Sequence, residues 1–262
     1  MINKNYFKYL IVTIVFFILV LSCQGYRMTN ASSLNINAGK DISEFDFNEI
    51  KLSSYRDSIS KEMNRHLNYS KINLDVGCPE GLLGDFISDL SILYIKKNIQ
   101  NIKFEPDFCI LNNGGFRNMI SKGPVTVNDI YQLMPFDNYL VILEIQGEQL
   151  SSLFNYIKNK SISNINRKSG VPLSGIRMKI SGDNITRCMI NNRTFNPLKK
   201  YKVLTTNYLA RGGDQMDFFK DCNLIFNTEF LLRDVIIKYI EELGKSNIQI
   251  NAQLDGRVQV LQ

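Results

Sequence analysis

The chain has 262 residues, of which 44% are hydrophobic, and a formal net charge of +6. This length and apolar content are sufficient for one large α/β body or two smaller ones, and they exclude wholesale disorder. The positive excess is modest, and no basic stripe is interleaved with aromatic residues. It therefore favours anionic small molecules slightly, and we expect no nucleic-acid partner.

Residues 1–22 are typical of an export signal. Lys4 and Lys8 precede an uncharged stretch that is shorter than the about 20 residues needed to span a hydrocarbon core. The stretch ends in Leu-Val-Leu-Ser-Cys, which resembles a bacterial lipoprotein signal in which Cys23 is lipidated and becomes the N-terminus. We therefore expect an exported, lipid-anchored protein of the bacterial cell envelope. The alternative is an ordinary secretory signal with an incidental cysteine.

The next segment, residues 23–50, is rich in Asn, Ser and Lys and predicts a tether. The folded domain is then expected to cover residues 51–262. Apolar residues at intervals of three and four predict a helix that starts near Glu80, with Pro79 in its first turn. A second helix is expected after Gly147.

A last helix is expected over residues 229–243, with Thr228 capping its start and Gly244 ending it. Between these helices, short apolar runs predict strands over residues 108–111, 139–146, 175–180 and 201–206. Residues 159–170 show neither period and predict an exposed loop. Mixed strands and helices with one apparent core indicate a single α+β domain, with a mixed sheet and packed helices.

The cysteines of the predicted domain lie at positions 78, 109, 188 and 222, without a C-x-x-C pair. Disulfides are one option in an oxidising compartment, but a domain of this size does not need them. We therefore expect mostly buried thiols. No two of these cysteines have the spacing of metal ligands, so no metal site is predicted in this chain.

The run Asn-Asn-Gly-Gly-Phe-Arg over residues 112–117 follows an apolar strand and predicts a loop that carries chemistry. Its two glycines let the backbone turn sharply, and Arg117 then offers a guanidinium to phosphate or carboxylate oxygens. The alternative is a simple turn with Arg117 as a surface charge.

Two aromatic residues also stand at predicted turns, Phe136 after Pro135 and Tyr208 at the end of a strand. Rings on facing loops can sandwich a nucleobase, and the alternative is that both belong to the core. Asn138 and Asp214 supply an amide and a carboxylate nearby in sequence for the base edge or sugar hydroxyls.

The three segments 112–117, 135–138 and 208–214 resemble, in order and spacing, the C-terminal substrate-binding domain of the 5'-nucleotidase family. The resemblance implies that Phe136 and Tyr208 clamp the base, Asn138 contacts it, Asp214 binds the ribose and Arg117 faces the phosphate. The substrate-binding residues expected on this basis are Asn113, Gly115, Arg117, Phe136, Asn138, Tyr208, Gly213 and Asp214. The further arginines that the family carries upstream are absent from residues 78–85, and Asp85 stands where the resemblance predicts asparagine.

The family's enzymes also carry a metallophosphatase domain with two divalent metal ions, and residues 24–70 do not resemble it. The chain has one histidine, His66, so no catalytic residue is assigned here and no cofactor is expected in this chain. The resemblance therefore implies a nucleotide- or nucleoside-recognition domain of a 5'-nucleotidase-type phosphohydrolase that acts with a separate metallophosphatase chain holding the two metals. The alternatives are a non-catalytic envelope lipoprotein that binds nucleosides or nucleotides, and a degenerate domain kept for interactions.

Overall fold

The computed structural model describes residues 49–99, 101–162, 166 and 168–261. The predicted export signal, the lipidation site Cys23 and most of the predicted tether lie outside these residues. Residues 50–262 form one compact unit. No helix in the described part of the chain has the length and apolar character to cross a membrane.

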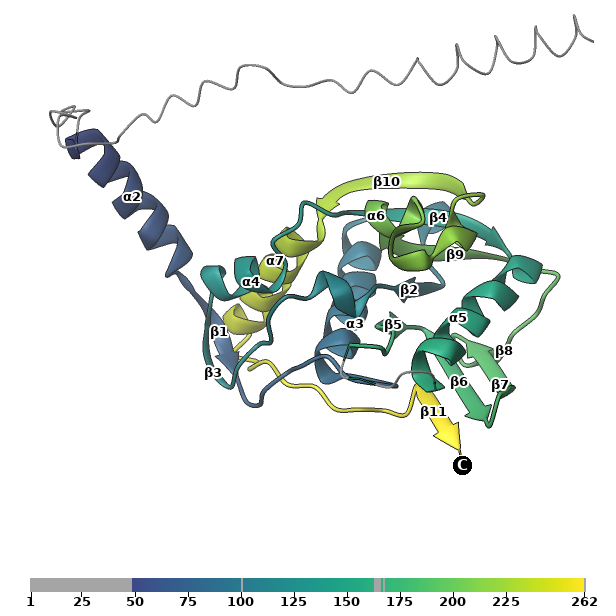
Figure 1. The fold of residues 1–262 in the computed structure, drawn as a ribbon. Helices are drawn as coiled ribbons and strands as arrows, with labels where there is room; N and C mark the ends of the chain where they lie inside the picture. The colour runs from purple at the N-terminus through teal and green to yellow at the C-terminus, as the bar shows by residue number, and fades with distance from the viewer. Residues whose placement is uncertain (1–48, 100, 163–165, 167, 262) are drawn as a thin grey trace, which may run out of the picture. The chain divides into compact units, whose positions relative to one another are not determined.

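Helices and strands are mixed along the chain and are drawn in Figure 1. The helices are α2 (Glu49–Met63), α3 (Leu82–Asn98), α4 (Val127–Leu133), α5 (Leu150–Ile162), α6 (Asn207–Ala210) and α7 (Leu232–Lys245). The strands are β1 (His66–Ser70), β2 (Phe108–Ile110), β3 (Gly123–Thr126), β4 (Tyr139–Gln146), β5 (Leu173–Ser174), β6 (Ile176–Ser181), β7 (Asn184–Ile190), β8 (Arg193–Thr194), β9 (Lys200–Thr206), β10 (Asn223–Leu231) and β11 (Val258–Leu261).

The central sheet has five strands in the order β10-β4-β9-β2-β5, and both of its faces are covered. Alternate residues of a strand point to opposite faces, and β4 shows this directly. Leu140 and Ile142 pack into a core with α3, α4 and α7, whereas Val141 and Leu143 pack into a second core with α5 and β6. Figure 1 shows α3 and α7 together, and α5 beside β6 and β7. The α+β class expected from the sequence is confirmed.

Strand direction brings three loops to one edge of this sheet. β2 runs parallel to β9, so the chain leaves both strands at the same edge. β4 runs antiparallel to β9 and pairs Leu140 with Thr206, so the turn before β4 lies at that edge as well. Ligands of open sheets of this kind bind outside the carboxyl ends of the parallel strands. The three motif segments therefore meet although up to about a hundred residues separate them in the sequence.

Two other sheets complete the unit. β1 and β3 form an antiparallel pair, and β11, β6, β7 and β8 form a four-stranded sheet in which β11 runs parallel to β6. The parallel pairing places β11, the last described strand, beside β6, which comes from the middle of the sequence. The exposed His66 lies in β1.

Several predicted boundaries are wrong. Pro79 is not in the first turn of α3, because that helix begins at Leu82 with Gly81 as its N-cap. Residues up to Ile162 continue α5, and Ser161 is buried, so the exposed loop predicted from residue 159 begins later. Predicted residues 229–231 of the last helix belong to β10 instead, where Leu231 pairs with Tyr139.

The predicted caps of the last helix are also replaced. The Thr228 hydroxyl donates to the Leu140 carbonyl across the sheet and does not cap α7, whose N-cap is Leu231 without a side-chain hydrogen bond. The helix continues through Gly244 to Lys245, and Ser246 is its C-cap. The four cysteines of the domain are free thiols, Cys109 buried and the others half-buried.

Candidate functional site: an aromatic cavity at the sheet edge

The cavity lies where the three loops meet and has a volume of about 310 Å³. Its walls combine two aromatic rings, a guanidinium, a carboxylate and backbone without side chains. The lining residues are Asn112, Gly114, Gly115, Arg117, Phe136, Asn138, Tyr208 and Asp214. This set contains six of the eight residues predicted for substrate binding.

The two rings are not core residues. Phe136 is 37% exposed and Tyr208 is 48% exposed, in a domain whose core aromatics such as Phe108 and Phe116 are below 3%. Both rings therefore present an apolar surface to the cavity and to solvent. That exposure costs free energy in water and is typical of a surface that a ligand covers.

Tyr208 is held by the loop that follows it. It lies in α6, which is capped when the Leu209 N–H donates to the Thr206 hydroxyl. A Cβ on Gly213 would come within 2.5 Å of the Tyr208 ring, so only a glycine permits this close approach. The Asp214 N–H donates to the Tyr208 hydroxyl at 3.2 Å. The ring is thus fixed at both its face and its tip.

Asp214 is positioned by its own backbone and by α5. Its φ of 54° is in the left-handed region, which Asp tolerates better than most residues. The Tyr156 hydroxyl donates to the Asp214 carbonyl at 3.0 Å. Burial, with a contribution from Asp214, raises the pKa of Tyr156, so this hydroxyl is a neutral donor at physiological pH. The Asp214 carboxylate remains available to the cavity.

Arg117 lines the same cavity from the glycine loop. Its N–H donates to the Leu133 carbonyl at 2.8 Å, which ties the glycine loop to the end of α4. Its guanidinium carbon lies 5.1 Å from the centre of the Phe136 ring. This cation–π contact holds the positive charge beside the ring.

Two predicted site residues lie next to the cavity without lining it. Asn113 is buried, and its amide donates to the carbonyls of Gly77 and Gly170 at 3.2 and 2.7 Å, so it ties the glycine loop to two other loops. Gly213 lies behind the Tyr208 ring and borders an adjoining hollow. Asn112 and Gly114 line the cavity instead. The sequence pattern of this loop does not predict which of its consecutive residues face the cavity.

The adjoining hollow has a volume of about 440 Å³ and shares Asn138 and Tyr208 with the cavity. Asn207 and Arg211 also line it, and sequence reasoning assigned neither of them. Arg211 lies at the variable position of the third motif segment, so the motif indicated no role for it. A ligand larger than the cavity can therefore extend past Tyr208 towards a second guanidinium.

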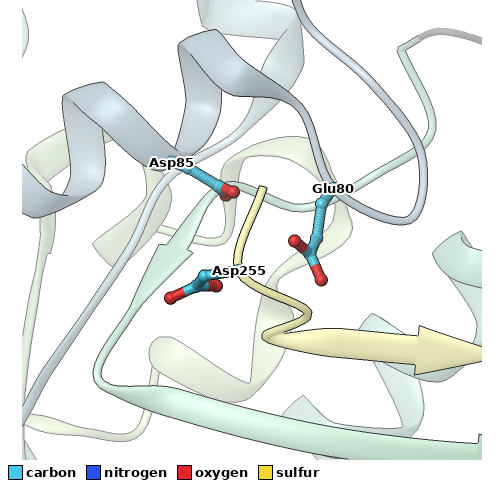
Figure 2. A group of neighbouring side chains, drawn as sticks. All are labelled: Glu80, Asp85 and Asp255. Atoms are coloured by element: carbon cyan, nitrogen blue, oxygen red, sulfur yellow. The ribbon is translucent and has the colours of Figure 1, made fainter. Parts of the chain in front are cut away.

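A group of carboxylates lies elsewhere, where α3 meets the segment before β11. Figure 2 shows Glu80, Asp85 and Asp255, whose oxygens lie within 4.8 Å of one another. Glu80 accepts from the N–H groups of Gly256 and Val258, at 3.2 and 2.7 Å. The Asp255 carboxylate accepts hydrogen bonds from the side chains of both Arg257 and Arg177.

Arg257 fills the space that a cation would need in this group. It is 7% exposed and also donates to both carboxylate oxygens of Asp89 at 3.0 Å. A divalent ion would have to displace a guanidinium and two backbone donors, so these residues do not fit a metal site. The group instead fastens the C-terminal segment to α3.

Asp85 is the exception within the group. One of its oxygens is buried without a hydrogen-bond partner, and the Arg257 Nε lies 3.5 Å from it. Burial raises the pKa of Asp85 to about 7, with Arg257 opposing the rise. The residue that replaces the expected asparagine is therefore a carboxyl group that holds a proton far above its usual range.

The structure is an α+β domain with a cavity at one edge of its central sheet. The family model for the 5'-nucleotidase C-terminal domain matches residues 63–221. The chain belongs to this family. All three motif segments lie within the matched residues.

Among proteins with sequence similarity, the protein UshA of Yersinia enterocolitica is 26% identical over 136 residues, or 52% of this chain. A 5'-nucleotidase of Vibrio parahaemolyticus is 27% identical over 145 residues, or 55% of this chain. The match covers 24% and 25% of these relatives. The chain therefore matches about a quarter of the length of each.

Among solved structures, a 5'-nucleotidase precursor from Thermus thermophilus superposes with a TM-score of 0.66 at 24% identity. The superposition covers 80% of this chain and 42% of that one. An NAD nucleotidase from Haemophilus influenzae gives a TM-score of 0.61 at 17% identity, over 80% of this chain and 40% of that one. At these identities the likeness establishes the fold.

Proposed function

We propose that this chain is the nucleotide-recognition domain of a 5'-nucleotidase-type phosphohydrolase. The observation that carries the proposal is the pair of half-exposed rings, Phe136 and Tyr208, on the walls of one cavity that also holds Arg117 and Asp214. Family membership supports it, because the relatives include 5'-nucleotidases.

In this proposal a nucleobase lies between the two rings, and stacking contributes roughly 1 to 3 kcal/mol per ring. The Asn138 amide reads the edge of the base, and the Asp214 carboxylate accepts hydrogen bonds from the ribose hydroxyls. The Arg117 guanidinium binds the phosphate oxygens with two parallel hydrogen bonds. With one guanidinium lining the cavity, we expect the phosphate to add less affinity than it would in a site with several arginines.

Hydrolysis, in this proposal, requires a separate metallophosphatase chain. Two divalent metals in that partner would activate water and stabilise the leaving oxygen. The residues that could bind metal in this chain support a separate metal-binding partner. The chain contains one histidine, which is exposed in β1, and the carboxylates around Arg257 do not fit a metal pair. This chain would bind and orient the substrate.

We also propose that the chain is exported and held at the bacterial envelope by a lipid on Cys23. The support is the order of charged, apolar and small residues before that cysteine. Metabolic labelling with a palmitate analogue tests it, because Cys23→Ser should lose the label. Persistence of the label in that variant would contradict lipidation at this position.

The central test combines binding with turnover. The full chain is titrated with AMP, adenosine and inorganic phosphate by calorimetry, and phosphate release from AMP is then measured with Mn²⁺ present, with and without a metallophosphatase chain encoded beside its gene. We expect AMP and adenosine to bind, and phosphate release only when both chains are present. Metal-dependent turnover by this chain alone would contradict the division of labour.

The same experiment separates the other functions. Binding of AMP that no candidate partner converts into turnover would favour a non-catalytic nucleotide-binding lipoprotein. Absence of binding to both AMP and adenosine would contradict nucleotide recognition altogether. As a site control, Arg117→Ala should weaken AMP binding while leaving adenosine binding within about twofold, since only AMP carries the phosphate.

A further inference from the structure

The middle of the turn that carries Phe136 and Asn138 has little packing of its own. Met134 is buried in the core, but residues 135–137 are exposed, and no helix or strand includes residues 134–138. A half-exposed ring on such a turn would sample several positions unless something outside the turn holds it. A clamp for a flat ligand requires a ring in one position, because the freedom lost on binding is subtracted from the affinity.

Arg233 supplies contacts on both sides of Phe136. It lies in the first turn of α7 and is 8% exposed. Its Nη1 donates to the Met134 carbonyl at 3.3 Å, and its Nη2 donates to the Asp137 carboxylate at 2.7 Å. The planar guanidinium therefore contacts the chain on both sides of Pro135 and Phe136.

The guanidinium is itself held in place. Its central carbon lies 4.4 Å from the centre of the Tyr131 ring, on α4. The neighbouring Leu232 N–H donates to the Asn138 carbonyl at 2.9 Å, so the start of α7 also fixes the other end of the turn. α4 and α7 pack against each other (Figure 1). The turn is thus anchored to two helices that belong to the core.

These contacts are poorly suited to a purely stabilising role. The Arg233 Nε is buried without a hydrogen-bond acceptor among the described residues. The Asp137 side chain is 72% exposed, and ion pairs with an exposed partner contribute little to stability. A buried ion pair is in general weak evidence for stability, because the cost of desolvating the charges offsets their attraction. Its fork geometry, which lysine lacks, is the property that the turn uses.

We propose that Arg233 is a positioning residue for ligand recognition: it holds the Met134–Asn138 turn so that Phe136 and Asn138 face the ligand. The proposal rests on the proposed function for the ligand itself. Arg233 lines no part of the cavity, so it acts through the turn and not by contact with the ligand.

Lys158 provides a matched control. It is 9% exposed and donates to the Asp183 carbonyl at 3.0 Å and to the carboxylate of the same residue, whose side chain is 82% exposed. It therefore makes the same kinds of contact as Arg233, in a different part of the domain. Lys158→Met removes a buried cation with an exposed partner and leaves the turn intact.

The first experiment measures AMP binding to the full chain by calorimetry. We expect Arg233→Met to weaken AMP binding by about tenfold and Arg233→Lys by less, while Lys158→Met leaves it unchanged. In a Phe136→Ala background, Arg233→Met should add less than a further twofold, because both changes act through one turn. Independent, multiplicative losses would overturn the proposal. If Arg233→Met does not fold, the double-mutant cycle with Phe136→Ala is measured with Asp137→Asn and with Arg233→Lys in its place.

The second experiment needs no ligand. The chain contains no tryptophan, so Phe136→Trp introduces a single tryptophan at the turn, which is excited selectively at wavelengths where tyrosine does not absorb. Adding Arg233→Met should lower its fluorescence anisotropy, whereas adding Lys158→Met should not. Equal anisotropy in the Arg233→Met and Lys158→Met variants of the Phe136→Trp chain would contradict positioning by Arg233. If the parent chain binds neither AMP nor adenosine, the proposed function fails, and this measurement still decides whether Arg233 holds the turn.

Discussion

Single residues decide whether the cavity can bind a flat ligand. Phe136 and Tyr208 are predicted from the sequence to lie at turns, and the structure places both on one cavity with Arg117, Asn138 and Asp214. Their role as a clamp stays a prediction. Arg233, by contrast, carries no signal in the sequence, because it lies in a helical period and its two partners are about a hundred residues away.

Removing either ring should therefore weaken ligand binding without unfolding the protein. We expect Phe136→Ala and Tyr208→Ala each to raise the Kd for AMP by about 5- to 150-fold, as loss of one stacking partner implies. The free energy of unfolding should change little, because both rings are exposed. Calorimetric titration and chemical denaturation measure the two quantities.

Tyr69→Ala serves as the control for these ring variants. This ring is 45% exposed on β1, outside the residues that line the cavity. It should leave the Kd for AMP unchanged. An equal loss of binding in Tyr69→Ala would show that the ring effects are indirect.

Asp85 makes the stability of the domain depend on pH. Its pKa is about 7 in the folded chain and 3.8 without the effects of burial. Below about pH 3 the group is protonated in both states, so it costs nothing. As the pH rises towards 7, the unfolded chain releases a proton that the folded chain keeps, and the free energy of unfolding falls. Above about pH 7 the loss is complete.

Asp85→Asn should remove this loss, since an amide does not titrate. We expect the variant to exceed the parent in free energy of unfolding by about 2 to 4 kcal/mol at pH 8, and by much less at pH 4. Urea denaturation at both values measures it. Asp221→Asn, which removes an exposed carboxylate, is the control. Parallel pH profiles for the parent and Asp85→Asn would contradict the buried-proton account.

At the scale of elements, the periodicity of apolar residues locates helix bodies and strands well. β4 has the bounds that its apolar run and the flanking turn residues predict, and the apolar spacing from Leu82 to Tyr94 lies within α3. The same signal does not locate the start of α7. Residues 229–231 have apolar neighbours at helical spacing, but pairing of β10 with β4 makes them a strand. That pairing joins residues far apart in the chain, so the local spacing of apolar residues does not predict it.

The loop after α6 allows a test at this scale. Gly213→Ala would place a Cβ within 2.5 Å of the Tyr208 ring, which must then move out of its position. We expect the Kd for AMP to rise by at least about tenfold while the unfolding midpoint stays close to that of the parent. Calorimetry and thermal denaturation report the two effects.

Gly114→Ala is the control within the same cavity. Its Cβ would meet only the side chains of Asn112 and Asp214, at 3.3 and 3.9 Å, and both can adjust. It should change the Kd less than Gly213→Ala does. If Gly114→Ala had the larger effect, the close approach of Gly213 to the ring would not be what fixes Tyr208.

At the scale of the whole molecule, the domain combines a covered sheet with a cavity at one edge. The order β10-β4-β9-β2-β5 brings the loops after β2 and β9 and the turn before β4 to that edge, and the two cores pack on opposite faces of the sheet. The sequence motifs predict which residues belong together, because the family resemblance spans all three loops. Only the strand directions explain why they meet.

The most direct test of the account is a crystal structure of the full chain bound to AMP. The account predicts that the adenine ring lies between Phe136 and Tyr208, with the phosphate on the side of Arg117 and the ribose hydroxyls within hydrogen-bond distance of Asp214. An adenine bound elsewhere on the domain, or a nucleotide whose phosphate lies away from Arg117 while its base leaves the two rings uncovered, would contradict it.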